Sequence, residues 1–305
     1  MFKFIKLFFF LGLIGLGAYF LAVKSLDEQP IKRFKQEHQP DARETVQTDL
    51  VRTTDVDSNL RPKQSDETSE KLISNYLAAS GGISAYSSLK NITASGTIIE
   101  AGHSKSFELI ETKEGQRQLT YSWKHLGRNY KMLYSFDGIH IWQQQLLPPK
   151  AHPEFYEGPS AWHFAHQRWL IQPFVAPQKA NFVFQYQGKS KVNGRTAYII
   201  CSFDKDNKRS WFHFDAETFL LTRWGGKSEI AGVEEYIDYR ATSFIKVNEV
   251  LLPQKIELLL RDSPFGTITF ETIAANQVID PGIFDMPLNK VPTLRQSVKE
   301  ANNKE

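Results

Sequence analysis

Short runs of alternating hydrophobic and polar residues fill the chain from Asn91 to Gln277, and turn residues separate the runs. In one such run, Leu119, Tyr121 and Trp123 alternate with small polar residues. A period of two is typical of a β-strand that buries one face and exposes the other. Because the runs are short and follow one another closely, the sequence predicts one large antiparallel sheet. The expected fold class is therefore mainly β with a few helices.

Two dipeptides indicate tight hairpins within this series. Asp137-Gly138 follows the expected strand Tyr130–Phe136. Asn193-Gly194 precedes the expected strand Thr196–Phe203. Both dipeptides favour the two-residue turns that join antiparallel neighbours. They support antiparallel pairing in both halves of the sheet.

A helix is predicted at Asp66–Ser80, before the strands begin. Either Ser65 or Asp66 can cap its first turn, and Gly81-Gly82 supplies the left-handed residue that favours its end. Its apolar positions recur at helical spacing, at Leu72, Ile73, Tyr76 and Leu77. This stripe predicts that the helix packs against the sheet.

One long segment, Pro153–Val175, interrupts the strand series. Pro159 precedes and Pro173 ends a predicted helix at Ser160–Gln172. Its larger side chains recur at helical spacing, at Trp162, Ala165, His166 and Trp169. Because this helix falls between two halves of an antiparallel sheet, we expect it to lie across the open face as a lid.

The N-terminal part of the chain differs in composition from the rest. Residues 1–23 contain the uncharged run Leu7–Val23, which predicts a signal anchor or transmembrane segment. A cleaved signal peptide is the alternative, although Val23-Lys24-Ser25 is a poor cleavage site. Residues 24–65 are polar and predict a flexible spacer, with a processed pro-segment as the alternative.

The body is predicted at residues 66–289, and residues 290–305 predict a disordered tail. A short N-terminal tail before an anchor usually stays in the cytoplasm. We therefore expect a single-pass protein of the bacterial inner membrane with its body in the periplasm. If the N-terminal segment is cleaved, the protein is periplasmic.

Composition narrows the classes of function. Hydrophobic residues make up 41% of the chain and aromatic residues 13%, enough for a large core. The formal net charge is only +3, and Lys and Arg are spread along the chain, so we expect no nucleic-acid partner. The single cysteine, Cys201, lies in an apolar run and is expected to be a buried free thiol.

Candidate catalytic and metal-binding groups are few. No phosphate-binding loop, dinucleotide fingerprint or nucleophile elbow occurs in the sequence. A cluster of histidines and carboxylates stands near the central helix, at His152, Glu154, Glu157, His163 and His166. The two helical histidines are three residues apart, whereas metal-binding helices usually space them four apart, so structural or solvated roles are expected. We predict no metal, no cofactor and no catalytic residues.

Several short motifs occur in a characteristic order along the body. They are Tyr76–Gly82, Ile92–Ile98, Trp211–Leu220, Asp238–Arg240, Leu252–Ile256 and Phe284–Pro287. In this order the chain, over Asp66–Leu288, resembles the bacterial outer-membrane lipoprotein-sorting (LolA/LolB-like) superfamily and its uncharacterised envelope members. The resemblance implies a non-enzymatic half-open β-barrel, covered by the N-terminal helix and the central lid helix, with an apolar cavity for acyl chains. An uncleaved anchor is incompatible with free shuttling of lipoproteins.

The resemblance makes a lipid or acyl chain the expected ligand, and the N-terminal segment the expected membrane contact. The alternative function is a protein-interaction or sensor module of the same fold that engages an envelope transport or sensor protein. Large apolar side chains are the candidate cavity and lid residues, although an ordinary packed core is the alternative for each. These candidates are Trp123, Met132, Tyr134, Trp142, Trp162, Trp169, Phe182, Phe184 and Trp211.

Overall fold

The computed structural model describes residues 61–150, 152–175, 181–230 and 233–287. The predicted anchor at 1–23, nearly all of the spacer at 24–65 and the tail at 290–305 lie outside these residues. Within the part that the structure describes, no helix is long and apolar enough to cross a membrane.

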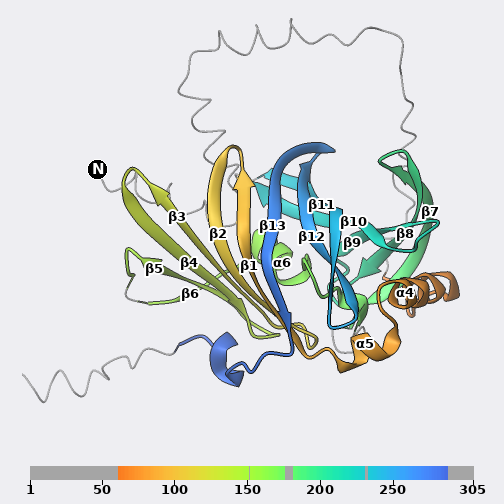
Figure 1. Ribbon diagram of the computed structural model, residues 1–305, viewed down its shortest axis with the longest axis horizontal. Helices are drawn as coiled ribbons and strands as arrows, with labels where there is room; N and C mark the ends of the chain where they lie inside the picture. The colour runs from red at the N-terminus through yellow and green to blue at the C-terminus, as the bar shows by residue number, and fades with distance from the viewer. Residues whose placement is uncertain (1–60, 151, 176–180, 231–232, 288–305) are drawn as a thin grey trace, which may run out of the picture.

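Thirteen antiparallel strands form one sheet in the order β6-β5-β4-β3-β2-β1-β13-β12-β11-β10-β9-β8-β7 (Figure 1). The first six strands are β1 (Asn91–Glu100), β2 (His103–Thr112), β3 (Arg117–His125), β4 (Arg128–Phe136), β5 (Ile141–Leu147) and β6 (Glu154–Phe155). The other seven are β7 (Val183–Val192), β8 (Arg195–Phe203), β9 (Arg209–Asp215), β10 (Leu221–Ile230), β11 (Val233–Val247), β12 (Val250–Leu260) and β13 (Ser263–Ala275). The predicted fold class is confirmed.

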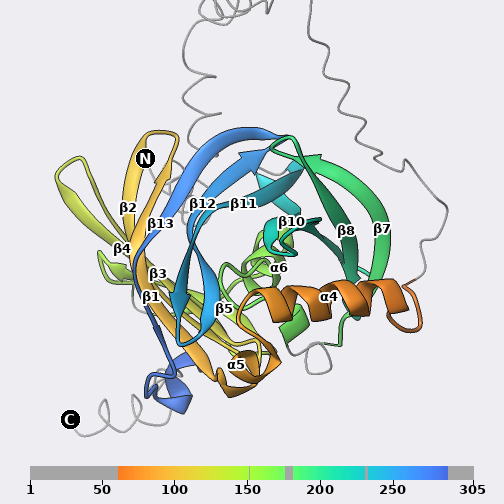
Figure 2. The same cartoon turned by 45° about the vertical axis from the view of Figure 1, so that its right-hand side comes forward.

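The sheet curves into a half-barrel that is not closed, because its outer strands β6 and β7 do not pair with each other. Figure 2 shows the strands arching around helix α6 (Pro159–His166), with helix α4 (Glu67–Ala79) crossing the lower end. Helix α5 (Ile83–Ser88) and the 3-10 turns η2 (Pro173–Val175) and η3 (Pro281–Phe284) complete the elements. A half-barrel covered by an N-terminal helix and a central helix matches the expectation from sequence.

Strand register decides which side chains face α6. Across β2 and β3, Leu109 pairs with Leu119, and across β3 and β4, Leu119 pairs with Tyr134. These residues are buried within the concave face, which holds one continuous hydrophobic core. Because side chains alternate along a strand, their neighbours in sequence point to the convex face.

Helix α4 covers the start of the edge strand β7. The Asp66 carboxylate caps the helix by accepting a hydrogen bond of 2.8 Å from the Ser69 N–H, as predicted. It also accepts a 2.6 Å bond from the N–H of Tyr186 in β7. The Ser65 hydroxyl accepts from the Phe184 N–H at 3.0 Å. The residues at the start of α4 thus accept hydrogen bonds from backbone N–H groups of the edge strand β7. Without these partners, the N–H groups could pair with a strand of another molecule.

Helix α6 is shorter than the predicted helix Ser160–Gln172. It ends at His166, and the next residues form a series of bends up to the 3-10 turn at Pro173. The reason is a distant carboxylate, Glu111 on β2. Its two oxygens accept the backbone N–H groups of residues 169, 170 and 171, which a continued helix would use for its own hydrogen bonds.

The convex face is covered locally by the turn η3 near the C-terminal end of the described body. The Phe284 carbonyl accepts bonds from Trp142 Nε1 at 2.8 Å and from the Ser135 hydroxyl at 3.1 Å. Gln118 donates to the Ile283 carbonyl at 2.6 Å. This face therefore has its own small buried patch, separate from the concave core.

Candidate functional site

Helix α6 packs closely against β10 of the concave sheet, where Gly226 has no side chain. A Cβ atom built at Gly226 would lie 2.7 Å from Nε2 of Gln167 at the end of the helix. Phe164 fills the other side and contacts the ring of Tyr134 with centroids 5.9 Å apart. The helix is therefore a packed element of the interior.

A buried carboxylate ties the segment after α6 to the sheet. The Glu111 side chain is fully buried, and it accepts N–H bonds of 3.0 Å from Trp169, 3.1 Å from Leu170 and 2.8 Å from Ile171. Three charge-assisted bonds to one carboxylate fix the backbone of this segment much as a helix cap does.

Two buried arginines surround the same carboxylate. Nε of Arg117 lies 3.4 Å from Glu111 Oε1, and Nε of Arg168 lies 3.8 Å from Oε2. Arg117 Nη1 donates to the carbonyls of Phe164 at 2.7 Å and Gln167 at 3.1 Å. Burial lowers the pKa of Arg168 to about 10, so this side chain remains charged at neutral pH. We call Glu111, Arg117 and Arg168 the buried charge cluster.

The sequence analysis missed the buried charge cluster. The sequence did contain a signal for this cluster. Glu111 lies two and four residues after Leu109 and Phe107 in one strand, so all three side chains point to the same buried face. A carboxylate at an inward position needs a partner, which the strand pattern indicates but does not name. The register supplies one partner directly, since Glu111 is paired with Arg117 across β2 and β3.

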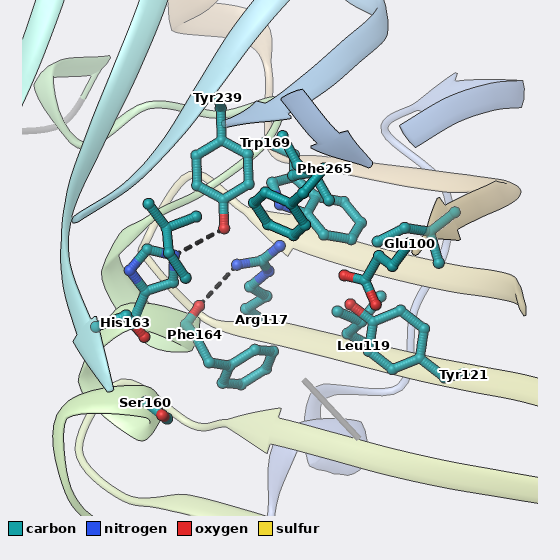
Figure 3. A pocket seen from close by; sticks show the side chains of 14 residues that line it. Glu100, Arg117, Leu119, Tyr121, Ser160, His163, Phe164, Trp169, Tyr239 and Phe265 are labelled. Atoms are coloured by element: carbon teal, nitrogen blue, oxygen red, sulfur yellow. Dashed lines mark hydrogen bonds between the residues drawn. The ribbon is translucent and has the colours of Figure 1, made fainter. Parts of the chain in front are cut away.

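A small cavity lies between α6 and the sheet. Its volume is about 30 Å³, and Figure 3 shows the Arg117 guanidinium among the side chains that line it. A volume of this size accommodates a group of only a few heavy atoms. Ligand pockets for lipid-sized molecules are roughly ten times larger. This cavity is therefore too small to be the predicted ligand-sized cavity, and the buried side chains of the described residues pack around it.

A larger cleft lies on the other side of α6. Its volume is about 590 Å³, within the range of small-molecule sites. We call it the α6 cleft. Helix α6 forms its floor, and the walls come from the β2–β3 and β4–β5 turns on one side and the β8–β9 turn on the other. Its principal apolar lining residues are Phe136, Ile141, Tyr156, Ala161, Trp162 and Phe182.

Trp162 is held in place at the floor of the α6 cleft. Its indole Nε1 donates a 2.7 Å bond to Asp204 Oδ2 in the β8–β9 turn. The His166 ring stacks on the indole at 4.8 Å, and Lys208 Nζ lies 5.5 Å from the indole ring centroid. Burial lowers the pKa of His166, which keeps the imidazole neutral at neutral pH. The floor is therefore a rigid, uncharged aromatic surface, with charged groups at its margin.

The nine predicted cavity and lid residues occupy three different places. Met132, Tyr134, Trp169 and Phe184 are buried in the concave core, and Trp123 packs half-buried at its margin, stacked on Tyr130. Only Trp162 and Phe182 line the α6 cleft.

The remaining two candidates, Trp142 and Trp211, lie on the convex face, which corrects their assignment to the cavity. Trp142 pairs with Ser135, whose neighbour Tyr134 points toward α6, so the indole points away from it. Trp211 likewise precedes Phe212, which packs against Phe174 in the core. Side chains alternate between the two faces of a strand, so the face that each tryptophan occupies depends on the residue at which its strand starts.

The histidines and carboxylates near α6 do not form a metal site. Among the described residues, no three His, Cys, Asp or Glu side chains gather as metal ligands would. His163 Nε2 lies 2.8 Å from the Tyr239 hydroxyl, and burial lowers the pKa of this imidazole to about 3. Burial also raises the pKa of the Cys201 thiol to about 12, so it is not a reactive thiolate.

Comparisons with known proteins found similar solved structures at low sequence identity. No family model and no curated protein matches the sequence. A solved DUF1329 family protein from Desulfovibrio piger covers 71% of this chain and 97% of its own, at 13% identity and a TM-score of 0.48.

Two further solved structures are similar. A putative outer membrane lipoprotein-sorting protein domain from Vibrio parahaemolyticus covers 72% of this chain and 97% of its own, with 9% identity and a TM-score of 0.49. A LolA superfamily protein from Nitrosomonas europaea covers 70% and 96%, with 9% identity and a TM-score of 0.46.

Proposed function

We propose that this protein is a non-catalytic, membrane-anchored envelope protein that binds a lipid or another hydrophobic ligand in the α6 cleft. It would serve as a carrier or as an accessory to a transport system, with its body in the periplasm. The observation that carries the proposal is the 590 Å³ cleft, whose floor and walls include Trp162, Phe136 and Phe182. A cleft of this size with an apolar floor and polar margin is typical of sites for hydrophobic ligands.

The affinity would come chiefly from apolar burial. Each methylene group moved from water into the cleft contributes about 0.8 kcal/mol. The carboxylate at the margin, Asp204, already accepts from Trp162 Nε1 and from the N–H groups of Asp206 and Lys208. Because these hydrogen bonds occupy the Asp204 carboxylate, its role is to position the floor of the α6 cleft. This role agrees with ligand binding rather than with general acid–base catalysis.

A pair of matched substitutions tests the site. Ile139 lines the α6 cleft with 81% of its surface exposed, whereas Leu126 is 88% exposed at the β3–β4 turn and does not line it. Both can accept a carboxylate without disturbing the core. Titration of the full chain with a fluorescent fatty-acid probe should show at least fivefold weaker binding for Ile139→Asp and unchanged binding for Leu126→Asp. Equal affinity in both variants and the wild type would contradict the proposal.

A second candidate function is the binding of a protein segment at the same place. Phe155 in the two-residue strand β6 is 60% exposed, and Ile139 stands exposed nearby in the β4–β5 turn. Because β6 covers only Trp142 and Gln143 of β5, an extended partner segment could pair with the rest of this edge. Native mass spectrometry of the full chain separates the two functions. A co-purified lipid supports the first, and a bound peptide with no lipid supports the second.

A further inference from the structure

Two polar groups point into the small cavity on the sheet side of α6. The Arg117 side chain is 2% exposed, and its Nη2 has no hydrogen-bond partner among the described residues. The Ser228 hydroxyl is fully buried and likewise has no partner among the residues that the structure describes. Both residues line the cavity, which we call the Arg117 cavity. Buried donors are almost always paired, so two of them at one cavity indicate a site for an acceptor.

The charge balance points to a negatively charged acceptor. Arg117 shares the Glu111 carboxylate with Arg168, which Glu114 also attracts, and Arg117 Nε lies 3.4 Å from Glu111 Oε1. The rings of Phe164 and Trp169 lie 5.1 and 4.8 Å from Arg117 Cζ, so the Arg117 guanidinium is only partly compensated. A buried charge without a full partner costs several kcal/mol, which an anion would recover.

The other charged group at the cavity already has a partner of opposite charge. Glu100 lines the opposite wall in Figure 3, and its Oε2 lies 3.0 Å from Lys105 Nζ. The imidazole of His163, which also lines the cavity, is neutral at neutral pH because of its burial.

We propose that the Arg117 cavity binds a carboxylate group, which accepts hydrogen bonds from Arg117 Nη2 and the Ser228 hydroxyl. The cavity volume of about 30 Å³ suits a group of three heavy atoms that carries one negative charge. A phosphate is larger and carries between one and two charges at neutral pH, so it fits this small cavity less well than a carboxylate. This site is separate from the α6 cleft, on the other side of the helix.

Two sources can supply this carboxylate. One is a small free carboxylate such as acetate. The other is the carboxyl end of an alkyl chain, whose first carbons would meet Ile98, Leu119 and Phe265 in the cavity wall. Acetate, decanoate and decanol distinguish these sources, because decanol keeps the chain and lacks the charge.

The test is isothermal titration calorimetry of the full chain with each of the three compounds at constant ionic strength. We expect acetate and decanoate to bind and decanoate to exceed decanol in affinity by about tenfold, because a charged hydrogen bond to a buried donor is lost with the alcohol. Ser228→Ala should weaken carboxylate binding about fivefold, through the loss of one hydrogen bond, without loss of fold. Arg117→Gln should abolish the difference between decanoate and decanol.

The outcomes separate this site from the proposed function. Equal binding of decanoate and decanol that is unchanged by Ser228→Ala would overturn the carboxylate site and leave the α6 cleft standing. Binding of acetate with no binding of decanol would support the site and contradict the hydrophobic-ligand function. If Arg117→Gln does not fold, Ser228→Ala still decides the question. No binding of either carboxylate means that the cavity holds only water, and it overturns the proposal.

Discussion

Glu111 and Arg117 face each other as a register pair of strands β2 and β3, with Arg117 Nε 3.4 Å from Glu111 Oε1 inside the half-barrel. Both side chains also bind the backbone of the central segment, Glu111 through three N–H groups and Arg117 through two carbonyls. This one pair therefore connects the sheet with the C-terminal end of α6 and with the residues that follow it.

Glu111→Gln should destabilise the protein by about 3–5 kcal/mol, because two buried guanidinium groups would lose the carboxylate that they share. Urea unfolding followed by circular dichroism measures the change. Glu108→Gln on the same strand is the control, since Glu108 is mostly exposed and its contact with Lys131 at 3.7 Å contributes no more than about 1 kcal/mol. Similar losses in the two variants would show that the buried charge cluster does not hold the segment.

Asp66→Ala should cost about 1–2 kcal/mol, because it removes a helix cap and the acceptor for Tyr186 on the edge strand. Burial alone would raise the pKa of this carboxyl, but the N–H groups of Ser69 and Tyr186 outweigh burial and lower the pKa. The stability from Asp66 is therefore complete above its unfolded pKa and is lost as the pH falls through the lower folded value. Unfolding at pH 7 and pH 3 should show a smaller difference between wild type and variant at pH 3.

His163 should make the protein less stable as the pH falls from about 6.5 toward 3. Burial lowers the pKa of its imidazole to about 3, so between these values the unfolded chain binds a proton that the folded chain does not. Stability thus rises with pH across this window. His163→Gln should flatten the dependence of the unfolding free energy on pH, whereas Tyr239→Phe, which removes only the hydroxyl partner, should retain it. An unchanged slope in His163→Gln would refute this assignment.

Trp142→Phe should lower stability by about 1–2 kcal/mol without changing the binding of a hydrophobic probe. The indole donates to the Phe284 carbonyl on the convex face, away from the α6 cleft. Trp162→Phe should weaken probe binding, because this indole forms the cleft floor. Unfolding curves and probe titrations on both variants test this division. If Trp142→Phe weakened probe binding at unchanged stability, the ligand would bind at the convex face and not in the α6 cleft, which would contradict the proposed site.

The strands and the first helix could be predicted because their signals are local. Alternation of side chains, the Asn193-Gly194 turn and the Asp66 cap each act within a few residues. The end of α6 could not be predicted in the same way, because it depends on Glu111, which is 58 residues from Trp169. A helical pattern alone therefore predicts too long a helix.

The candidate site was harder to predict than the fold. Large aromatic residues are buried on both faces of this sheet, so size alone does not separate Trp142 on the convex face from Tyr134 on the concave face. Hydrophobic character also gives no indication that the interior would be filled and that the ligand-sized cleft would lie beyond α6. The position of the cleft depends on the combined volume of side chains that many strands contribute to the core.

Photo-crosslinking of a diazirine-labelled fatty acid to the full chain, followed by peptide mapping, tests the central claim most directly. Binding in the α6 cleft predicts label on the turn that carries Ile139, on α6 near Trp162, and at Phe182. The label should be displaced by unlabelled fatty acid and should be lost in Ile139→Asp. Label concentrated instead on the concave strands around Met132, or on the convex face at Trp211, would contradict the account.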